Sequence, residues 1–328
     1  MTSGKADSRP DKRLGEFELI AELFAPLSKG APGAFGLTDD AAVLAPPPGH
    51  ELVLKTDAIV EGVHFFRTDP PGDIARKSLR VNLSDLAAKG AVPMGYLMAL
   101  LLPDWPDRAW LHAFADGLAA DQAAFGLSLM GGDTTATPGP LAVSISAFGH
   151  VPLGAMIRRA GAQPGDLVFV SGTIGDAGGG LAVLKENRSA PELVARYRVP
   201  QPRLALGPEL RGLASASLDV SDGLMADLGH IAHVSKVRIE VDAPRIPLSN
   251  ALRGLWGEEA VARAAVAGDD YEIAFTAPAS LRADAANAAA RSGVAVTEIG
   301  RVAAGEGAVL LDASGREIVL ARSGYTHF

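Results

Sequence analysis

The chain has 328 residues, of which 48% are hydrophobic and 21% charged, a balance typical of a packed globular protein rather than a disordered one. Its formal net charge of −8 argues against non-specific nucleic-acid binding, which needs a basic surface. Cysteine is absent, which excludes disulfides, thiolate metal sites and thiol nucleophiles and is compatible with a reducing compartment.

No segment of the sequence has the pattern of a signal peptide or of a membrane span. Residues 1–13 are polar and mixed in charge, without the apolar core of a leader. The longest apolar run, around residues 96–103, is far too short to cross a bilayer. We therefore expect a cytoplasmic protein whose partners include neither a membrane nor a nucleic acid.

The first part of the chain reads as alternating helices and strands. Residues 1–14 are predicted to be a flexible tail, and apolar residues at helical spacing predict a helix over residues 16–27. The further elements expected up to residue 149 are a loop at 45–49, a strand at 51–56 that ends at Asp57, a helix at 74–89 with Asp73 as N-cap and Gly90 at its end, a helix at 107–125, and strands at 127–130 and 141–149.

The composition changes near residue 150, where proline and glycine cluster before a new strand at residues 166–171. A glycine-rich turn at residues 172–180, a helix and several mixed segments follow. We therefore predict an α/β fold of two domains, an N-terminal domain over residues 15–150 and a C-terminal domain over residues 151–328.

Aspartates stand at the junctions between apolar segments and turns. They are Asp39, Asp40, Asp57, Asp133, Asp219, Asp222, Asp269 and Asp270. Asp85 differs because it lies inside a predicted helix among apolar neighbours, where a carboxylate is costly unless a positive group meets it. Each aspartate alone is explained as a turn or cap residue. Together, with 7 histidines and no cysteine, they favour a hard cation such as Mg²⁺.

Other chemical signals are weaker. The sequence has no P-loop and no dinucleotide-binding glycine motif, so the candidate phosphate-binding segment is the glycine-rich stretch 171–180, with Arg158 and Arg159 before it. Ser221 lies in V-S-D-G-L rather than in G-x-S-x-G, which gives no support to a catalytic triad. His64 lies among apolar residues, and on that ground alone a packed, hydrogen-bonded histidine is the expected reading.

A series of motifs resembles the thiamine-monophosphate kinase family. In chain order they are G-E-F-E-L-I at 15–20, D-D-A-A-V-L at 39–44, T-D-x-x-V-E-G-V-H-F at 56–65, N-L-S-D-L-A-A-x-G-A at 82–91, G-G-D-T-T at 131–135, D-V-S-D-G-L at 219–224, D-Y-E at 270–272 and G-Y-x-H-F at 324–328. The resemblance extends from Gly15 to Phe328 in the family's order, so the set is highly specific.

The resemblance implies a fold shared with aminoimidazole ribonucleotide synthetase and a homodimer that binds ATP at the dimer interface beside several Mg²⁺ ions. The positions that match metal-binding residues are Asp40, Thr56, Asp57, Asp85, Asp133, Asp219 and Asp222. Those that match contacts with ATP are Gly132, Asp133, Arg159 and Ser221, and those on the substrate side are His64, Asp269 and Tyr325. The resemblance thus gives His64 a substrate-side role in place of a packing one.

Three positions depart from the family pattern. Thr38 replaces a glycine, so the turn there must avoid a glycine-only conformation. Asp269 replaces a glutamate and has a shorter reach towards substrate. Lys55 replaces a serine beside the metal-binding positions, and we expect its ammonium group to stand in for one cation.

The expected reaction is the ATP-dependent phosphorylation of thiamine monophosphate to thiamine diphosphate by direct in-line transfer. No catalytic residue is assigned, because the attacking phosphate oxygen is already ionised and needs no general base. Aminoimidazole ribonucleotide synthetase chemistry and a non-catalytic nucleotide-binding dimer remain as alternatives. Relatives that depend on a cysteine or selenocysteine are disfavoured because the chain has no cysteine.

Overall fold

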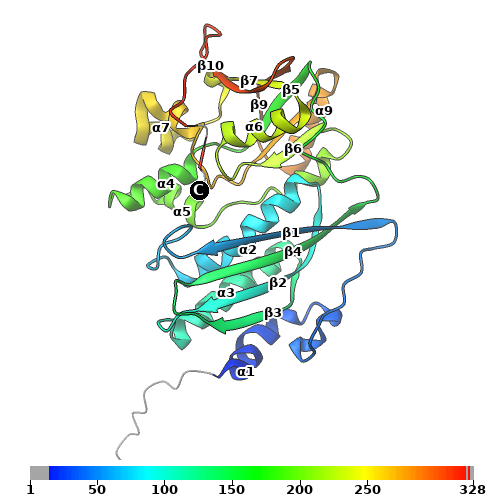
Figure 1. Ribbon diagram of the computed structural model, residues 1–328, viewed down its shortest axis with the longest axis vertical. Coiled ribbons are helices and arrows are strands. Elements are labelled where there is room, and N and C mark those ends of the chain that lie inside the picture. Colours follow the sequence, from blue (N-terminus) through cyan, green and yellow to red (C-terminus); the bar gives the residue numbers. More distant parts are fainter. Residues whose placement is uncertain (1–14, 323, 326–328) are drawn as a thin grey trace, which may run out of the picture. The chain divides into compact units, whose positions relative to one another are not determined.

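A computed structural model describes residues 15–322 and 324–325 (Figure 1). The chain forms two compact units that are interleaved along the sequence. The first unit comprises the described residues up to Leu44 together with Ala58–Arg76 and Gly95–Ser144. The second comprises Ala45–Asp57, Lys77–Met94 and Ile145 onwards. Among the described residues, no helix combines the length and apolar character needed to cross a membrane.

The first unit begins with a helical segment that changes its winding. The predicted helix over 16–27 is present as α1 (Glu16–Leu19), a π-helical turn (Ile20–Phe24) and a 3₁₀ turn (Ala25–Ser28), and a further 3₁₀ segment covers Pro32–Leu37. Pro26 has no N–H to donate, which accounts for the irregular end of the helix.

The first unit also contains a parallel strand pair and its crossover helix. Within β2 (Val92–Leu102), the residues from Gly95 pair in parallel with β3 (Ser128–Ala136). The connection is α3 (Arg108–Phe125), as a parallel pair requires. Asp107 is its N-cap and accepts a 2.7 Å hydrogen bond from the Trp110 N–H, so the predicted start of this helix is confirmed.

Strands β1 (His50–Val60) and β4 (Ala142–Pro152) complete a sheet in the order β1-β4-β2-β3. Helix α2 (Pro71–Ala88) begins earlier than predicted, and the expectation of Asp73 as N-cap is wrong. Asp73 lies in the first turn, and its N–H donates to the Pro70 carbonyl. Proline at the first helical position is favourable because its missing N–H has no partner there. The predicted end is confirmed by Gly90, whose φ is +70°.

The second unit contains a six-stranded sheet in the order β10-β7-β9-β5-β8-β6. The strands are β5 (Asp166–Ser171), β6 (Ala216–Asp219), β7 (Arg238–Asp242), β8 (Ile273–Pro278), β9 (Val296–Ala303) and β10 (Gly307–Leu311). Only β10 and β7 pair in parallel among the described ladders of this sheet. The predicted strand at 166–171 is present with the same bounds.

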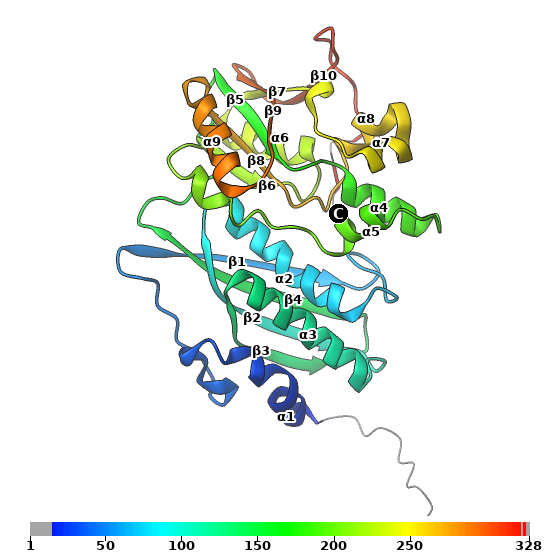
Figure 2. The same cartoon turned by 180° about the vertical axis from the view of Figure 1, so that it is seen from behind.

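Both faces of the six-stranded sheet are buried. Val168 and Val170 belong to one core with α6 (Leu224–Ser235), whereas Leu167 and Phe169 on the opposite face of β5 belong to another with α9 (Arg282–Ser292). Figure 1 shows α6 in front of the sheet, and Figure 2, seen from behind, shows α9 in front. Burial on both faces explains the unbroken apolar run of β5.

The remaining helices include α4 and α5, which pack closely. The helices are α4 (Asp176–Lys185), α5 (Pro191–Arg198), α7 (Asn250–Trp256) and α8 (Ala260–Ala264), with 3₁₀ segments at Gly207–Leu210, Ala243–Arg245, Gly257–Glu259 and Ala279–Leu281. The predicted turn at 172–180 is therefore shorter than expected, because α4 starts within it. A Cβ on Gly180 would lie 2.2 Å from the Leu193 carbonyl oxygen, so glycine there permits the close packing.

Candidate active site

The two acidic motifs of the second unit lie together because β6 and β8 are antiparallel neighbours. Asp219, the last residue of β6, is in register with Ile273, the first of β8. The chain beyond β6 therefore runs beside the chain that precedes β8. Three backbone hydrogen bonds of 2.8 Å continue the pairing, from Val220 N–H to the Glu272 carbonyl, from Tyr271 N–H to the Val220 carbonyl and from Asp269 N–H to the Ser221 carbonyl.

The segment before β8 has an unusual backbone. Asp269 and Tyr271 both have positive φ, at 69° and 53°. Non-glycine residues seldom adopt this conformation, and strain of this kind concentrates at functional sites. Helix α2 lies beside the segment, because the Ser84 hydroxyl is 3.4 Å from the Tyr271 carbonyl oxygen and the Lys77 ammonium is 3.0 Å from Asp269 Oδ2.

A cluster of three carboxylates, which we call the aspartate cluster, consists of Asp57, Asp85 and Asp219. Lys55 lies within it, with Nζ 3.1 Å from Asp57 Oδ1 and 2.8 Å from Asp85 Oδ2. Lys55 is thus the positive group that a carboxylate inside an apolar helix requires. Asp219 belongs to the cluster because its charge interacts with those of Asp85 and Lys55, and it lies buried at the end of β6.

The aspartate cluster favours added positive charge. Burial raises the pKa of Asp57, an effect that Lys55 opposes and the Asp85 charge reinforces. Burial and the Asp85 charge raise the pKa of Asp219 well above its ordinary value. The Lys55 ammonium is partly desolvated, but Asp85 and Asp57 outweigh this effect and raise the Lys55 pKa. Carboxylates in this state gain stability from a cation.

The cluster also fits a hard metal ion by its donor atoms. Asp219 Oδ2 is buried and has no hydrogen-bond partner in the part of the chain that the structure describes. An unpartnered buried carboxylate oxygen is costly, and a cation would remove that cost. All side-chain donors in the cluster are oxygens, the ligands that Mg²⁺ prefers. Asp57, Asp85 and Asp219 are therefore suited to hold Mg²⁺.

A second lysine lies beside the cluster. Lys89 Nζ donates a 2.5 Å hydrogen bond to the carbonyl of Ser217 in β6, two residues before Asp219. Burial lowers the Lys89 pKa to about 8, although the Asp219 charge works against this. Arg159, expected to contact ATP, is exposed and also lowers the Lys89 pKa by its charge. Lys89 therefore interacts both with the carboxylates of the cluster and with the charge of Arg159.

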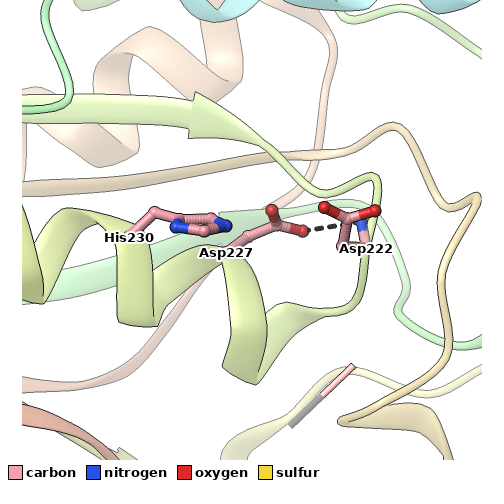
Figure 3. A group of neighbouring side chains, drawn as sticks. All are labelled: Asp222, Asp227 and His230. Carbon is pink, nitrogen blue, oxygen red and sulfur yellow. Dashed lines mark hydrogen bonds between the residues drawn. The ribbon is translucent and has the colours of Figure 1, made fainter. Parts of the chain in front are cut away.

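The turn after β6 is held by a buried aspartate. Asp227 Oδ2 accepts hydrogen bonds from the N–H groups of Ser221, Asp222 and Gly223 at 3.0, 3.0 and 3.1 Å. Burial and the Asp222 charge raise its pKa to about 7. Figure 3 shows Asp227 between Asp222 and His230, and one ligand atom of each lies within 4.8 Å of the others. Because Asp227 Oδ2 already binds three amides, we assign Asp227 to the support of the turn.

The predicted substrate-side residues of the second unit lie near this turn. Tyr325 N–H donates a 2.9 Å hydrogen bond to the Asp222 carbonyl. Asp269 is bound by two groups, with Oδ2 on Lys77 and Oδ1 accepting from the Tyr271 hydroxyl at 3.3 Å. Lys77 is only 2% exposed and lies 3.8 Å from the centre of the Tyr197 ring. Its charge is therefore held in a buried position directed at Asp269.

The glycine-rich stretch 171–180, the candidate phosphate-binding segment, binds an acidic side chain of the protein at the start of α4. The Gly175 N–H donates to Asp270 Oδ2 at 2.6 Å and the Ala177 N–H to Asp270 Oδ1 at 3.3 Å. A carboxylate of the protein thus already occupies the start of α4. Glu272 is fully buried and binds Arg196, Arg203 and Ser171. It thereby holds Ser171, the first residue of the glycine-rich stretch.

Four predicted site residues belong to the first unit. Asp40 and Asp133 are exposed carboxylates, and Asp40 N–H donates to Asp39 Oδ1 at 2.8 Å. His64 Nδ1 accepts a 3.0 Å hydrogen bond from Val60 N–H in the turn after β1. A Cβ on Gly132 would lie 1.9 Å from the Met98 carbonyl oxygen, so only glycine fits beside β2.

Thr56 and Thr38 can be compared directly with their expectations. Side chains alternate along a strand, so Thr56 points to the face of β1 opposite Lys55 and Asp57. Its hydroxyl donates to the Ile145 carbonyl at 3.1 Å, so the structure does not bring that hydroxyl to the aspartate cluster. Thr38 has a φ of −109°, so the turn avoids a glycine-only conformation, as expected.

Sequence reasoning did not find Lys77, Lys89 or Asp227. Lys89 follows Asp85 by four residues, a spacing that places both on one face of a helix and could have indicated a charge pair. Asp227 interrupts the apolar face of a helix directly after D-V-S-D-G-L, the same signal that singled out Asp85. Lys77 gives no such signal, because its partner Asp269 lies in a distant part of the sequence.

Comparison with known proteins identifies the family. Residues 38–151 match the family model of the AIR synthase related protein, N-terminal domain, and residues 163–312 match that of the C-terminal domain. The thiamine-monophosphate kinase of Caulobacter vibrioides is 46% identical over 95% of this chain and 90% of its own length.

Solved structures show the same likeness. The thiamine-monophosphate kinase from Stenotrophomonas maltophilia K279a is 40% identical, with a TM-score of 0.82 over 90% of this chain and 97% of that one. AaThiL complexed with AMPPCP and TMP is 32% identical, with a TM-score of 0.76 over 97% of this chain and 99% of that one. The predicted two-domain α/β fold is thereby confirmed. This chain is a kinase that belongs to the thiamine-monophosphate kinase family, within the AIR synthase related proteins.

Proposed function

We propose that this protein transfers the γ-phosphoryl group of ATP to thiamine monophosphate, yielding thiamine diphosphate and ADP in the cytoplasm, with Mg²⁺ as cofactor. The observation that carries the proposal is the aspartate cluster, with its buried Asp219 Oδ2 that has no partner among the residues described. The relative complexed with AMPPCP and TMP supports the choice of substrates, because it matches nearly the whole chain.

The chemistry requires two anions to approach each other. An oxygen of the thiamine phosphate attacks the γ-phosphorus, a new P–O bond forms, and the bond to the β-phosphate oxygen breaks as ADP leaves with the electron pair. The attacking oxygen is ionised near neutral pH, so no side chain has to remove a proton. Bound Mg²⁺ would supply positive charge between the phosphates. The protein's task is therefore to hold both substrates in line.

We assign the residues to this task by position. Asp57, Asp85 and Asp219 would hold Mg²⁺, and Asp40, Asp133 and Asp222 are further proposed ligands. Gly132, Arg159 and Ser221 are proposed to contact ATP. His64, Asp269 and Tyr325 are proposed for thiamine monophosphate. The Asp269 carboxylate, fixed by Lys77 and Tyr271, is well suited to face a cationic substrate.

Direct detection of the product tests the proposal. Purified protein is incubated with ATP, Mg²⁺ and thiamine monophosphate, thiamine diphosphate is sought by chromatography, and free thiamine serves as a parallel substrate. We expect the diphosphate from the monophosphate alone, and a loss of at least about 100-fold in Asp85→Asn, since it removes a ligand charge. Asp284→Asn, an exposed acid on α9, is the matched control and should keep full activity. ATP binding without any product would contradict the proposal and favour a non-catalytic nucleotide-binding protein.

We also propose that the protein acts as a homodimer. Leu52 and Leu54 are 37% and 66% exposed on the face of β1 opposite Lys55, and a second copy would cover them. Light scattering after size exclusion should give twice the chain mass for the wild type and a monomer for Leu54→Glu. Leu153→Glu changes a leucine that is 68% exposed outside the strand and should leave the dimer intact. A monomeric wild type would contradict this assignment.

A further inference from the structure

We propose that the ammonium group of Lys55 is a built-in cation of the aspartate cluster, so that this chain binds one divalent ion fewer than its carboxylates could otherwise hold. The inference rests on the proposed function in one respect, the assignment of Asp57, Asp85 and Asp219 as ligands of Mg²⁺. It goes further because it gives a fixed residue the place of an exchangeable ion.

The geometry places Lys55 where a bridging ion would lie. Its Nζ contacts one oxygen of Asp57, from β1, and one oxygen of Asp85, from α2, at 3.1 and 2.8 Å. Lys55 and Asp57 are two residues apart on the same face of β1, so both side chains point towards α2. An ammonium group has three N–H donors, and two of them are directed at these carboxylates.

The surroundings favour retention of the lysine. The Lys55 side chain is 29% exposed and that of Asp85 15%, so this pair is largely shielded from solvent. A divalent ion between Asp57 and Asp85 would have to displace the ammonium group from both carboxylates or lie against a like charge. Asp219 Oδ2 has no partner within the described residues and remains available for an ion. The cluster thus has one position filled by the chain and another open to metal.

Counting bound ions tests this inference. Mn²⁺ replaces Mg²⁺, and its number per chain is measured by equilibrium dialysis with metal analysis, in saturating AMPPCP. We expect Lys55→Ser and Lys55→Met to bind one Mn²⁺ more per chain than the wild type, because both free the Asp57 and Asp85 oxygens. Lys185→Ser, which removes an exposed lysine from the end of α4, should match the wild type.

Two results would overturn the inference. Equal counts in the wild type and both Lys55 variants would mean that the lysine moves away when metal binds. A rise in Lys55→Ser alone would show that the added hydroxyl, and not the lost ammonium, accounts for the extra ion. Circular dichroism of each variant confirms that it is folded before ions are counted.

A second measurement keeps this result separate from the proposed reaction. A crystal of the wild type with Mn²⁺ and AMPPCP should show no anomalous peak between Asp57 and Asp85, and a peak there would overturn the inference. The product assay on the wild type runs in parallel. A changed ion count without thiamine diphosphate would remove the proposed reaction and leave the Lys55 assignment. Formation of thiamine diphosphate together with equal ion counts in the wild type and the Lys55 variants would support the proposed reaction and remove the Lys55 assignment.

Discussion

Lys77 shows how a single buried charge can organise the candidate site. The Lys77 ammonium lies against the face of the Tyr197 ring and pairs with Asp269. The strained backbone around Asp269 directs this carboxylate towards α2. Lys77 is buried and Asp269 half-buried, so breaking the pair would leave a buried ammonium without its carboxylate partner. The Asp269 carboxylate is therefore oriented before any substrate binds, which lowers the entropic cost of binding.

Replacing Lys77 should affect the two substrates differently. Lys77→Met keeps most of the apolar stem of the side chain but removes the ammonium, so that the Tyr271 hydroxyl is the side-chain partner of Asp269 that remains among the described residues. We expect the KM for thiamine monophosphate to rise about tenfold, a loss of about 1.4 kcal/mol, with the KM for ATP unchanged. Steady-state kinetics with each substrate varied in turn measures this, and Lys185→Met serves as the exposed-lysine control. An equal rise in both KM values would argue for a general loss of structure instead.

At the scale of single residues, the sequence predicted which kind of group a side chain needs better than it predicted which residue supplies it. The apolar neighbours of Asp85 predicted that a positive group must meet it, and Lys55 was already noted as a departure from the family pattern. Only the packing of β1 against α2 identified Lys55 as the partner of Asp85. The Thr56 side chain was assigned to the metal by resemblance, whereas strand alternation turns it to the other face.

At the scale of elements, α4 depends on a side chain from outside the helix. Asp270 accepts the N–H groups of Gly175 and Ala177 at the start of α4, where a helix has no internal acceptors. Asp270→Asn keeps the shape but replaces one acceptor with a donor. We expect a loss of about 1–3 kcal/mol in the free energy of unfolding, measured in urea. Asp284→Asn should change it by less than about 0.5 kcal/mol, and similar losses in both variants would contradict the capping role.

The ends of β1 and β4 predict a pH effect. His50 and His150 meet edge to face with ring centres 4.9 Å apart, and His150 Nδ1 is buried with no partner among the described residues. Burial lowers the His150 pKa, and the neighbouring His50 and Arg211 lower it further. The neutral form is thus favoured in the folded state.

The sign of the effect follows from linkage. As the pH falls below about 6.5, the unfolded chain takes up the proton first, so the stability that depends on neutral His150 is lost. Urea unfolding of the wild type at about pH 8 and about pH 5.5 should show a larger loss than His150→Gln shows over the same interval. His233→Gln, exposed on α6, is the control, and an identical pH dependence in all three proteins would refute the effect.

Some elements followed from the sequence and others did not. The strand at 166–171 was predicted with the same bounds because its apolar run ends at turn residues on both sides. The start of α2 was missed because aspartate is a typical N-cap residue, which suggested Asp73, whereas the helix already begins at Pro71. The glycines of α4 were predicted as a turn, since only the packing against α5 explains glycine within a helix.

At the scale of the whole molecule, added metal should raise stability. A ligand that binds only the folded protein stabilises it by about 2.7 kcal/mol at 100 times its Kd. We therefore expect Mg²⁺ to raise the thermal midpoint of the wild type and to have a much smaller effect on Asp219→Asn. Scanning fluorimetry with and without Mg²⁺ measures both, with Asp284→Asn as control. The same shift in the wild type and Asp219→Asn would place the ion elsewhere.

The motifs predicted the family and the two-domain fold over the whole chain, and the comparisons confirm both. The domain boundary near residue 150 stays a prediction. The compact units of the structure are interleaved, with Arg76 in the first and Lys77, the next residue of α2, in the second. Such a division depends on contacts between distant segments, so composition along the chain does not reveal it.

The antiparallel pairing of β6 with β8 limits where the chain can change in length. Deleting one residue within β8 would exchange the side chains that face α6 with those that face α9. It would also shift the Gly268–Glu272 segment by one position against the turn that carries Asp222. An insertion in the exposed turn at 304–306, between β9 and β10, leaves this register untouched. Related proteins should therefore vary in length at that turn while keeping the spacing from Asp269 to Ile273 constant.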